Sequence, residues 1–352
     1  MCTEQLYRVV DLTKQADRYN NRRQKAFIYS NKNRDIDECW PFPHYLKTPI
    51  PCGSCIECRL SKAQEWAFRC MKEAAEYKDN IMVTLTYDDE HLPKGVRLDP
   101  NTGELLGESL TLPDHEEIQK FMKRLRKVYG DGVKLYGCGE YGSDKEYKDW
   151  KGNTRQATER PHYHIILFNV KVDDLKFWKY SYCEWAPKIK NPLYKSATMS
   201  KLWKKGHVDL NEVNYETCCY VAGYVMKKWK GRGSDEHYLL KGQKPPYTFM
   251  SRRPGIGHAF FEKNKDKFFN EETFWQVTKK GLKEIRPGRY FDKLMESEDE
   301  QAFLHIKNSR EKKSLENTER LMQKTDITRH EYIENKESKN KLRTRFMKRS
   351  LI

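Results

Sequence analysis

Two tyrosines and a lysine within residues 215–230 form the pattern in this chain that is best suited to chemistry. The segment reads YETCCYVAGYVMKKWK. If it is helical, Tyr220 and Tyr224 lie one turn apart, with Cβ atoms about 6 Å from each other. Lys227 falls on the same stripe, and Lys228 lies beside it. A phenol attacks phosphorus well only when it is deprotonated, and a nearby amine can stabilise the phenolate or the transition state.

A second pattern, RPHYHIILFN at 160–169, predicts a strand that begins with two histidines. Strand alternation places His162 and His164 on one face, about 7 Å apart along the backbone. Glu140 lies near the end of another predicted strand, at 133–141. If these strands pair, the carboxylate completes a three-ligand site with open positions. This donor set suits Mn²⁺, or Mg²⁺ at cellular excess, better than a closed structural zinc site.

Each pattern alone is weak, because paired tyrosines usually pack and paired histidines are common on surfaces. Together they predict an attack of a phenol on a phosphodiester whose charge a divalent ion neutralises. The product would be a 5′-phosphotyrosine and a free 3′-hydroxyl, and rejoining would need no nucleotide. The chain has no G-x-x-x-x-G-K-[ST] sequence, which is consistent with chemistry that needs no ATPase.

Two overlapping C-x-x-C units, CGSCIEC at 52–58, form a third pattern. Cys52, Cys55 and Cys58 can supply three thiolates to zinc. The alternative is a turn whose thiols bind no metal, since no second C-x-x-C pair follows. The candidates for a fourth ligand are Cys39, His44 and Cys70.

The elements that must position these residues alternate between helices and strands. The predicted helices cover 61–75, which Ser61 and Gln64 would cap, 114–129 and the tyrosine segment; the predicted strands cover 81–87, 133–141, 160–169 and 207–213. Residues 171–206 are expected to be mixed helix and loop, with Trp178, Trp185 and Trp203 as packing anchors. Residues 241–258 read as a basic loop rich in Pro and Gly.

The composition points to nucleic acid as a partner. The net charge is +16 and aromatic residues make up 12% of the chain. This balance favours a nucleic-acid-binding protein over an ordinary enzyme with a basic surface. No apolar run is long enough for a membrane span, and the first residues, MCTEQLYRVV, do not resemble a signal peptide. The ten cysteines are therefore expected to be thiols or metal ligands in a reducing compartment.

Four blocks carry a family resemblance: MVTLTYDDEHLP (82–93), CGEYG (138–142), RPHYH (160–164) and YVAGYVMKK (220–228). In this order they resemble the replication initiators of microviruses, small single-stranded DNA bacteriophages, and above all the gokushovirus branch. Those proteins belong to the HUH endonucleases of rolling-circle replication. PCGSCIECR (51–59) and MSRRPGIGHAFF (250–261) also resemble segments of that branch.

The resemblance implies an α+β fold, with a central antiparallel β-sheet, flanking helices and a ferredoxin/RRM-like core. It also frames an expected division of the chain. The parts are a basic arm (1–50), an endonuclease domain (51–235), a basic loop and helical extension (236–295) and a charged, loosely ordered tail (296–352).

The resemblance further implies an initiator that nicks circular phage DNA at its origin and later rejoins the strand. His162, His164 and Glu140 match the family's ligands for a divalent ion, Tyr220 and Tyr224 the paired nucleophiles, and Lys227 the lysine that follows them. Gly223 stands where related initiators often carry a basic residue. The implied partners are single-stranded and origin DNA and the host helicase, single-strand-binding protein and DNA polymerase, in the bacterial cytoplasm and without a membrane.

Two other functions fit the same residues. One is a plasmid initiator or mobilisation relaxase with the same chemistry. The other is a non-catalytic, zinc-dependent DNA-binding regulator, in which the cysteines matter and the tyrosines are structural.

Overall fold

A computed structural model describes the chain over residues 6–11, 26–30, 45–99, 101–142, 146–148, 154–156, 159–183, 186–224, 234–278, 281–327 and 329–344. The described residues form two compact units. The first combines Met1–Ser61 with Thr318–Thr344, and the second spans Lys62–Asn317. The second unit contains the histidines and the tyrosines.

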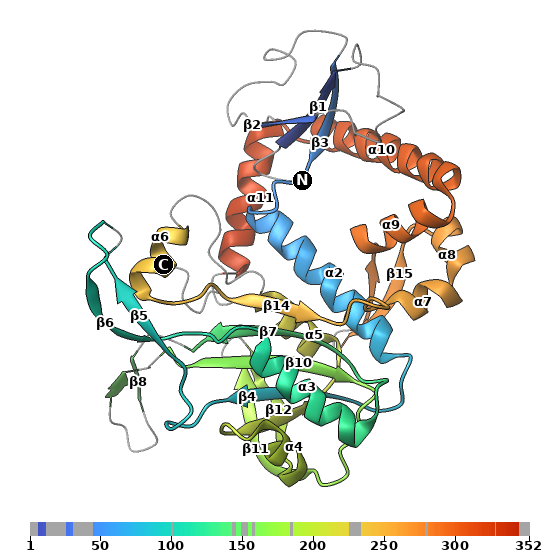
Figure 1. Ribbon diagram of the computed structural model, residues 1–352. Helices are drawn as coiled ribbons and strands as arrows, with labels where there is room; N and C mark the ends of the chain where they lie inside the picture. The colour runs from blue at the N-terminus through green and yellow to red at the C-terminus, as the bar shows by residue number, and fades with distance from the viewer. Residues whose placement is uncertain are drawn as a thin grey trace, which may run out of the picture. The chain divides into compact units, whose positions relative to one another are not determined.

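A seven-stranded antiparallel sheet forms the centre of the second unit (Figure 1). Its order is β11-β12-β13-β4-β10-β7-β14. The strands are β4 (Asn80–Thr86), β7 (Lys134–Tyr141), β10 (Pro161–Phe168), β11 (Lys176–Cys183), β12 (Ala186–Lys195), β13 (Val208–Glu212) and β14 (Tyr247–Met250). The predicted α+β fold with a central antiparallel sheet is confirmed.

One face of this sheet packs against helices α3 (Glu116–Tyr129) and α4 (Ala197–Trp203) (Figure 1). Apolar residues recur along α3 every three or four positions, so one stripe of the helix can be buried. Phe121 from this stripe contacts Trp203, which in turn contacts Tyr163 of β10, with ring centroids 6.0 and 6.1 Å apart. All three rings are fully buried. Because alternate residues of β10 point to opposite faces, this core turns His162 and His164 to the other side.

The other face carries helix α5 (Tyr215–Gly223) and the later turns of helix α2 (Ile56–Ala74). Trp66 of α2 stacks on Tyr136 of β7, with ring centroids 4.5 Å apart. Cys218 of α5 is fully buried, and its thiol is hydrogen-bonded to that of Cys70. The tyrosine helix is therefore fixed to the sheet through apolar contacts.

Smaller elements complete the second unit. They are β5 (Lys94–Leu98), β6 (Leu105–Leu110), β8 (Glu146–Lys148), β9 (Thr154–Gln156), α6 (Ser234–Lys241), α7 (His258–Lys263), α8 (Lys265–Asn270), β15 (Phe274–Thr278), β16 (Gly281–Ile285) and α9 (Arg289–Glu298). Helix α10 (Glu300–Gln323) follows them. Within the described part of the chain, every helix is too short or too polar to cross a membrane.

The first unit contains a three-stranded antiparallel sheet, ordered β2-β1-β3, and helix α11 (Arg329–Thr344). Its strands are β1 (Leu6–Asp11), β2 (Ala26–Ser30) and β3 (Tyr45–Ile50). The described residues of the region that was expected to be a loosely ordered tail are thus mainly helical. The expected domain divisions at 50, 235 and 295 stay predictions.

Three local predictions are wrong. Helix α2 begins at Ile56, and Arg59 N–H already donates to the Cys55 carbonyl at 3.1 Å, so Ser61 is not a cap. Residues 171–206 contain β11 and β12, whose lysine-rich sequences lack apolar alternation because much of this hairpin faces solvent. Residues 247–250 form β14, an edge strand short enough to tolerate the surrounding prolines.

The tryptophan anchors separate in the same way. Trp203 is fully buried and its indole Nε1–H donates to the Thr86 carbonyl at 2.8 Å, as expected of an anchor. Trp178 is 48% exposed and was wrongly predicted to pack. Trp185 lies outside the described residues.

Candidate functional site

The pairing of β7 with β10 brings Glu140, His162 and His164 together. In the register of this pair, His162 lies opposite Glu140 and His164 lies opposite Cys138. One ligand atom from each of the three side chains lies within 4.8 Å of the other two. The predicted pairing of the strands is therefore confirmed, and it supplies the geometry of a three-ligand site.

Hydrogen bonds at the far nitrogens fix both imidazole rings. His162 Nδ1 lies 3.0 Å from the Arg160 carbonyl oxygen, which can only accept, so Nδ1 carries the proton. His164 Nδ1 is hydrogen-bonded to the Thr84 hydroxyl at 2.9 Å. Such outer partners orient metal-binding histidines. The two Nε2 atoms consequently face Glu140 Oε1, at 3.0 and 3.3 Å.

The electrostatics of this cluster call for a positive charge. Glu140 is 3% exposed and His164 is 5% exposed, so a bare carboxylate there would be poorly solvated. A lone pair on Nε2 of His162 would repel the carboxylate unless a proton or a cation lies between them. Two imidazole nitrogens and a carboxylate oxygen fit a Mn²⁺-type ion, and the remaining positions would be open to water or substrate.

Helix α5 presents both tyrosines to this cluster. Its first turn is fixed by a capping box in which the Thr217 N–H donates to the Asn214 side chain at 2.9 Å, and the Asn214 N–H donates to the Thr217 hydroxyl at 2.9 Å. The Tyr220 ring meets the His164 ring edge-on at 5.2 Å. The Tyr224 ring stacks on His164 at 4.8 Å, with an interplanar angle of 6°.

The two phenols differ in their surroundings. Tyr220 is 48% exposed, whereas Tyr224 is 5% exposed. Burial raises the pKa of the Tyr224 phenol well above its usual range, and the nearby Tyr220 phenol and Glu140 carboxylate add to the rise. Tyr220 is therefore the phenol that solvent and a large substrate reach first.

The third predicted catalytic residue, Lys227, lies outside the described residues, as does Lys228. Helix α5 ends at Gly223, and the description of the chain resumes at Ser234. The predicted role of Lys227 stays a prediction.

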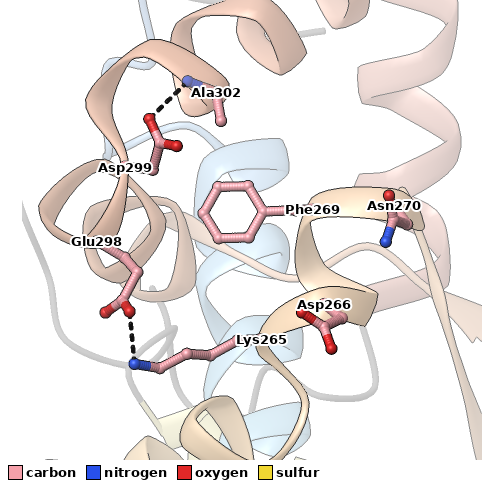
Figure 2. A pocket seen from close by; sticks show the side chains of 7 residues that line it. All are labelled: Lys265, Asp266, Phe269, Asn270, Glu298, Asp299 and Ala302. Carbon is pink, nitrogen blue, oxygen red and sulfur yellow. Dashed lines mark hydrogen bonds and ion pairs between the residues drawn. The ribbon is translucent and has the colours of Figure 1, made fainter.

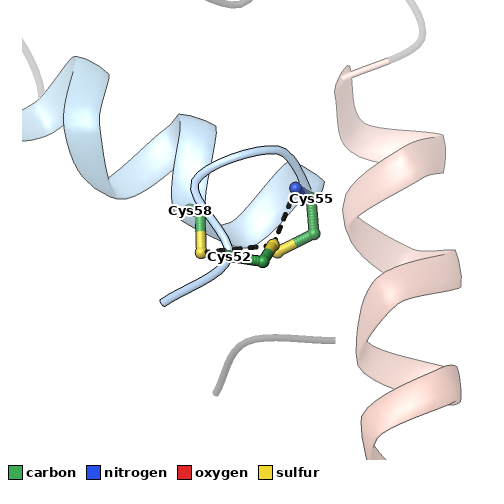
Figure 3. A group of neighbouring side chains, drawn as sticks. All are labelled: Cys52, Cys55 and Cys58. Carbon is green, nitrogen blue, oxygen red and sulfur yellow. Dashed lines mark hydrogen bonds between the residues drawn. The ribbon is translucent and has the colours of Figure 1, made fainter. Parts of the chain in front are cut away.

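The cysteine cluster belongs to the first unit. Cys52 Sγ lies 4.0 Å from Cys58 Sγ, and the Cys55 N–H donates to Cys52 Sγ at 3.2 Å (Figure 3). Of the predicted fourth ligands, Cys39 and His44 lie outside the described residues. The hydrogen bond between the Cys70 and Cys218 thiols accounts for Cys70 in another way.

Sequence reasoning missed the two residues that orient the histidines. Thr84 was placed only on one face of the predicted strand, and the Arg160 carbonyl carries no side-chain signal. The register that sets His164 opposite Thr84 joins residues 80 positions apart. Strand alternation gives the face of Thr84 but not that partner.

A separate hollow lies between α8, the end of α9 and the start of α10, and none of the candidate residues lines it (Figure 2). Lys265 Nζ pairs with Glu298 at 2.7 Å, and the Ala302 N–H donates to Asp299 at 2.9 Å. These lining charges are satisfied locally, so the hollow adds nothing to the site.

Comparison with known proteins gives a consistent result. A family model described as a replication-associated protein of the ORF2 type matches residues 80–229, which include the histidine strand and both tyrosines. The replication-associated protein ORF2 of Spiroplasma virus 4 is 33% identical over 279 residues, which cover 76% of this chain and 75% of that protein. The chain belongs to this family of phage replication-associated proteins.

Two further relatives of this replication-associated protein match over shorter stretches. VP4 of Bdellovibrio phage phiMH2K is 32% identical over 64% of this chain and 60% of its own length. ORF4 of Chlamydia phage 1 is 31% identical over 51% of this chain and 39% of its own length. No solved structure matches the chain. The resemblance to microvirus replication initiators is confirmed.

Proposed function

We propose that this protein is a site-specific single-strand DNA endonuclease and strand transferase that initiates rolling-circle replication of a circular phage genome. The observation that carries the proposal is the position of two tyrosine rings, 5.2 and 4.8 Å from the ring of a histidine that faces a buried carboxylate. Nucleophiles and ion ligands meet on one face of one sheet.

The reaction transfers a phosphoryl group to a phenol. The tyrosine oxygen forms a bond to phosphorus while the bond from phosphorus to the 3′ oxygen breaks. The phenol loses a proton and the departing 3′ oxygen gains one. A 5′-phosphotyrosine conserves the energy of the phosphodiester, so a 3′-hydroxyl can later reverse the step and rejoin the strand.

Residues of this chain would supply the other requirements. Glu140, His162 and His164 would hold a Mg²⁺ or Mn²⁺ ion, which when bound neutralises phosphate charge. Thr84 and the Arg160 carbonyl would keep the two imidazoles turned towards it. Lys227 would stabilise the phenolate or the transition state.

The exposure of the two tyrosines supports an order of attack. Tyr220, the exposed phenol, would cleave the origin first and remain joined to the DNA. Tyr224 would attack the regenerated junction after one round of copying. One-turn spacing lets both phenols reach the same phosphate site.

The biological setting follows from the family. The substrate would be single-stranded DNA at the phage origin, in the cytoplasm of a bacterial host. Host helicase, single-strand-binding protein and DNA polymerase would extend the freed 3′-hydroxyl. The relatives' names refer to phage replication, which favours this setting over a plasmid initiator or a mobilisation relaxase.

The proposal is tested by adduct formation. Full-length protein is incubated with labelled single-stranded origin DNA and Mn²⁺, and covalent complexes are separated under denaturing conditions. We expect an adduct that the double substitution Tyr220→Phe, Tyr224→Phe abolishes and the control Tyr215→Phe retains. An adduct that survives the double substitution rules out these nucleophiles, and tight binding without any adduct supports the regulator instead.

A further inference from the structure

Three thiols outside the proposed DNA-cleavage site are placed as ligands of a single metal ion. The Sγ atoms of Cys52, Cys55 and Cys58 lie within 4.8 Å of one another, and the Cys52–Cys58 separation is 4.0 Å (Figure 3). Bonds of about 2.3 Å from zinc to sulfur in a tetrahedral site place two sulfurs about 3.8 Å apart. The thiols therefore need little movement to bind one ion.

The backbone around these thiols favours negative charge on sulfur. The Cys55 N–H and the Ser54 hydroxyl donate to Cys52 Sγ at 3.2 and 3.4 Å. Gly53 has a φ of +75°, a left-handed conformation that aims these donors back at the sulfur. Cys58 lies in the first turn of α2, where the helix dipole stabilises a thiolate. Three adjacent thiolates would repel one another without a cation.

We propose that Cys52, Cys55 and Cys58 bind a structural zinc ion in the first unit. An all-sulfur donor set selects a soft ion such as zinc over Mg²⁺ or Mn²⁺. The fourth position is left to water or to a ligand from outside the described residues.

The ion would hold together contacts that are distant in sequence. Glu57 lies between two of the ligands, and its carboxylate pairs with Lys336 Nζ at 3.6 Å and accepts a hydrogen bond from Asn340, both in α11. By fixing the turn that carries Glu57, zinc would stabilise the contact of α11 with the start of α2.

The test measures metal content of the full-length protein. We expect about one zinc per chain in the wild type, in the control Cys219→Ser and in the double substitution His162→Ala, His164→Ala. Cys55→Ser and Cys58→Ser should lose more than nine-tenths of it. Zinc content unchanged by the cysteine substitutions, or absent from the wild type, overturns the proposal.

A second readout covers a cysteine variant that fails to fold. Wild-type protein is stripped of metal and titrated with Co²⁺, whose thiolate complexes absorb strongly in the near ultraviolet. A thiolate band that saturates at one equivalent and that zinc removes supports the proposal. A titration without this band contradicts it.

A different observation concerns the edge strand β11, where aromatic side chains face solvent. Phe177, Trp178 and Tyr180 are 55%, 48% and 47% exposed. The register slips between Phe177 and Lys179, so Trp178 is the extra residue of a bulge. Folding gains little from leaving three large rings in water, and adjacent exposed rings mark a binding surface.

Lysines accompany these rings. Lys179 and Lys195 place Nζ atoms 4.0 and 4.2 Å from the centroid of the Trp178 ring. Lys176 is exposed on the same strand. Alternating rings and ammonium groups match single-stranded nucleic acid, whose bases stack on rings and whose phosphates pair with cations.

We propose that β11 binds single-stranded DNA beside the cleavage site, with bases stacked on Phe177, Trp178 and Tyr180. This rests on the proposed function for the choice of DNA as the ligand. A base that stacks on Trp178 would displace an ammonium group from the ring, and that group could then contact a phosphate.

The test separates binding from cleavage. The affinity for labelled oligothymidine is measured in the absence of divalent ion for Trp178→Ala and for Phe177→Ala with Tyr180→Ala. We expect a loss of roughly tenfold for each variant, because stacking contributes on that scale. Trp275→Ala is the matched control, since Trp275 is 63% exposed on β15, and it should bind as the wild type does.

The outcomes distinguish this proposal from the proposed function. Unchanged affinity in both β11 variants overturns it. Unchanged affinity together with the loss of a dimer in sedimentation assigns the surface to self-association. Weakened binding in a protein that never forms an adduct supports the β11 surface and contradicts the cleavage reaction.

Discussion

The two clusters of candidate metal ligands in this protein differ in donor atoms and in how the chain builds them. Glu140, His162 and His164 offer oxygen and nitrogen from two paired strands, under a helix that carries two phenols. Cys52 and Cys58 offer sulfur from a turn and the first turn of a helix, only six residues apart. The first set suits a hard or borderline ion with open positions, and the second suits a closed zinc site.

The difference shows how a site's construction limits its role. The histidine cluster depends on long-range strand pairing, which holds the ligands rigidly and leaves one side towards Tyr220 and Tyr224. The cysteine cluster is local, and the nearest feature with a defined contact is helix α11 through Glu57. We therefore assign chemistry to the first cluster and stability to the second.

The largest expected effect comes from removing a histidine. His162→Ala or His164→Ala should reduce the rate of cleavage by at least about a thousandfold, because the phosphate charge is no longer neutralised. Retained affinity for origin DNA would show that the fold survives. Cleavage at the wild-type rate by either variant would remove that histidine from the site.

Chelation should separate the two clusters without any substitution. Brief treatment with EDTA should stop cleavage, and added Mn²⁺ should restore it, because open sites with oxygen and nitrogen ligands exchange ions readily. Zinc content, measured on the same samples, should change little. Parallel loss of zinc and of activity would mean that the clusters are not independent.

A smaller effect is expected at the residue that orients His164. Thr84→Val removes the hydroxyl 2.9 Å from Nδ1 and should lower cleavage or Mn²⁺ affinity by roughly 10- to 100-fold. Thr86→Val on the same strand is the control, since the Thr86 hydroxyl donates to the His207 carbonyl. Equal behaviour of the two variants would contradict an orienting role for Thr84.

The smallest effect on chemistry is expected from Cys55→Ser. The initial rate of cleavage at low temperature should stay within about threefold of the wild-type rate, because the cysteines do not contact the reacting groups. Limited proteolysis should instead cut near α11 earlier than in the wild type. A large loss of rate in an intact, folded variant would place the cysteines in the reaction.

The sequence predicted the parts of this site that depend on local periodicity. The strand at 160–169 and the helix at 114–129 are found within two residues of their expected ends, because each has a clear apolar pattern. The pairing of β7 with β10 could be stated as a condition and is met. Tyr220 and Tyr224 lie beside His164, as their proposed roles require.

Other features could not be predicted because they depend on tertiary contacts. Strand β11 is lysine-rich and exposed, so it lacks the alternation by which strands are recognised, and Trp178 could not be told from a core tryptophan by type alone. The start of α2 was placed too late, since a capping-box spacing at Ser61 also occurs inside a helix. The partner of His164 Nδ1 depends on strand register.

The most direct test of the central claim is the position of a bound ion. Crystals grown with Mn²⁺ would be measured by anomalous diffraction. We predict one strong peak at bonding distance, roughly 2.0–2.3 Å, from Glu140 and from Nε2 of His162 and His164, on the side facing Tyr220. A peak elsewhere, with these three side chains unliganded, would contradict the account.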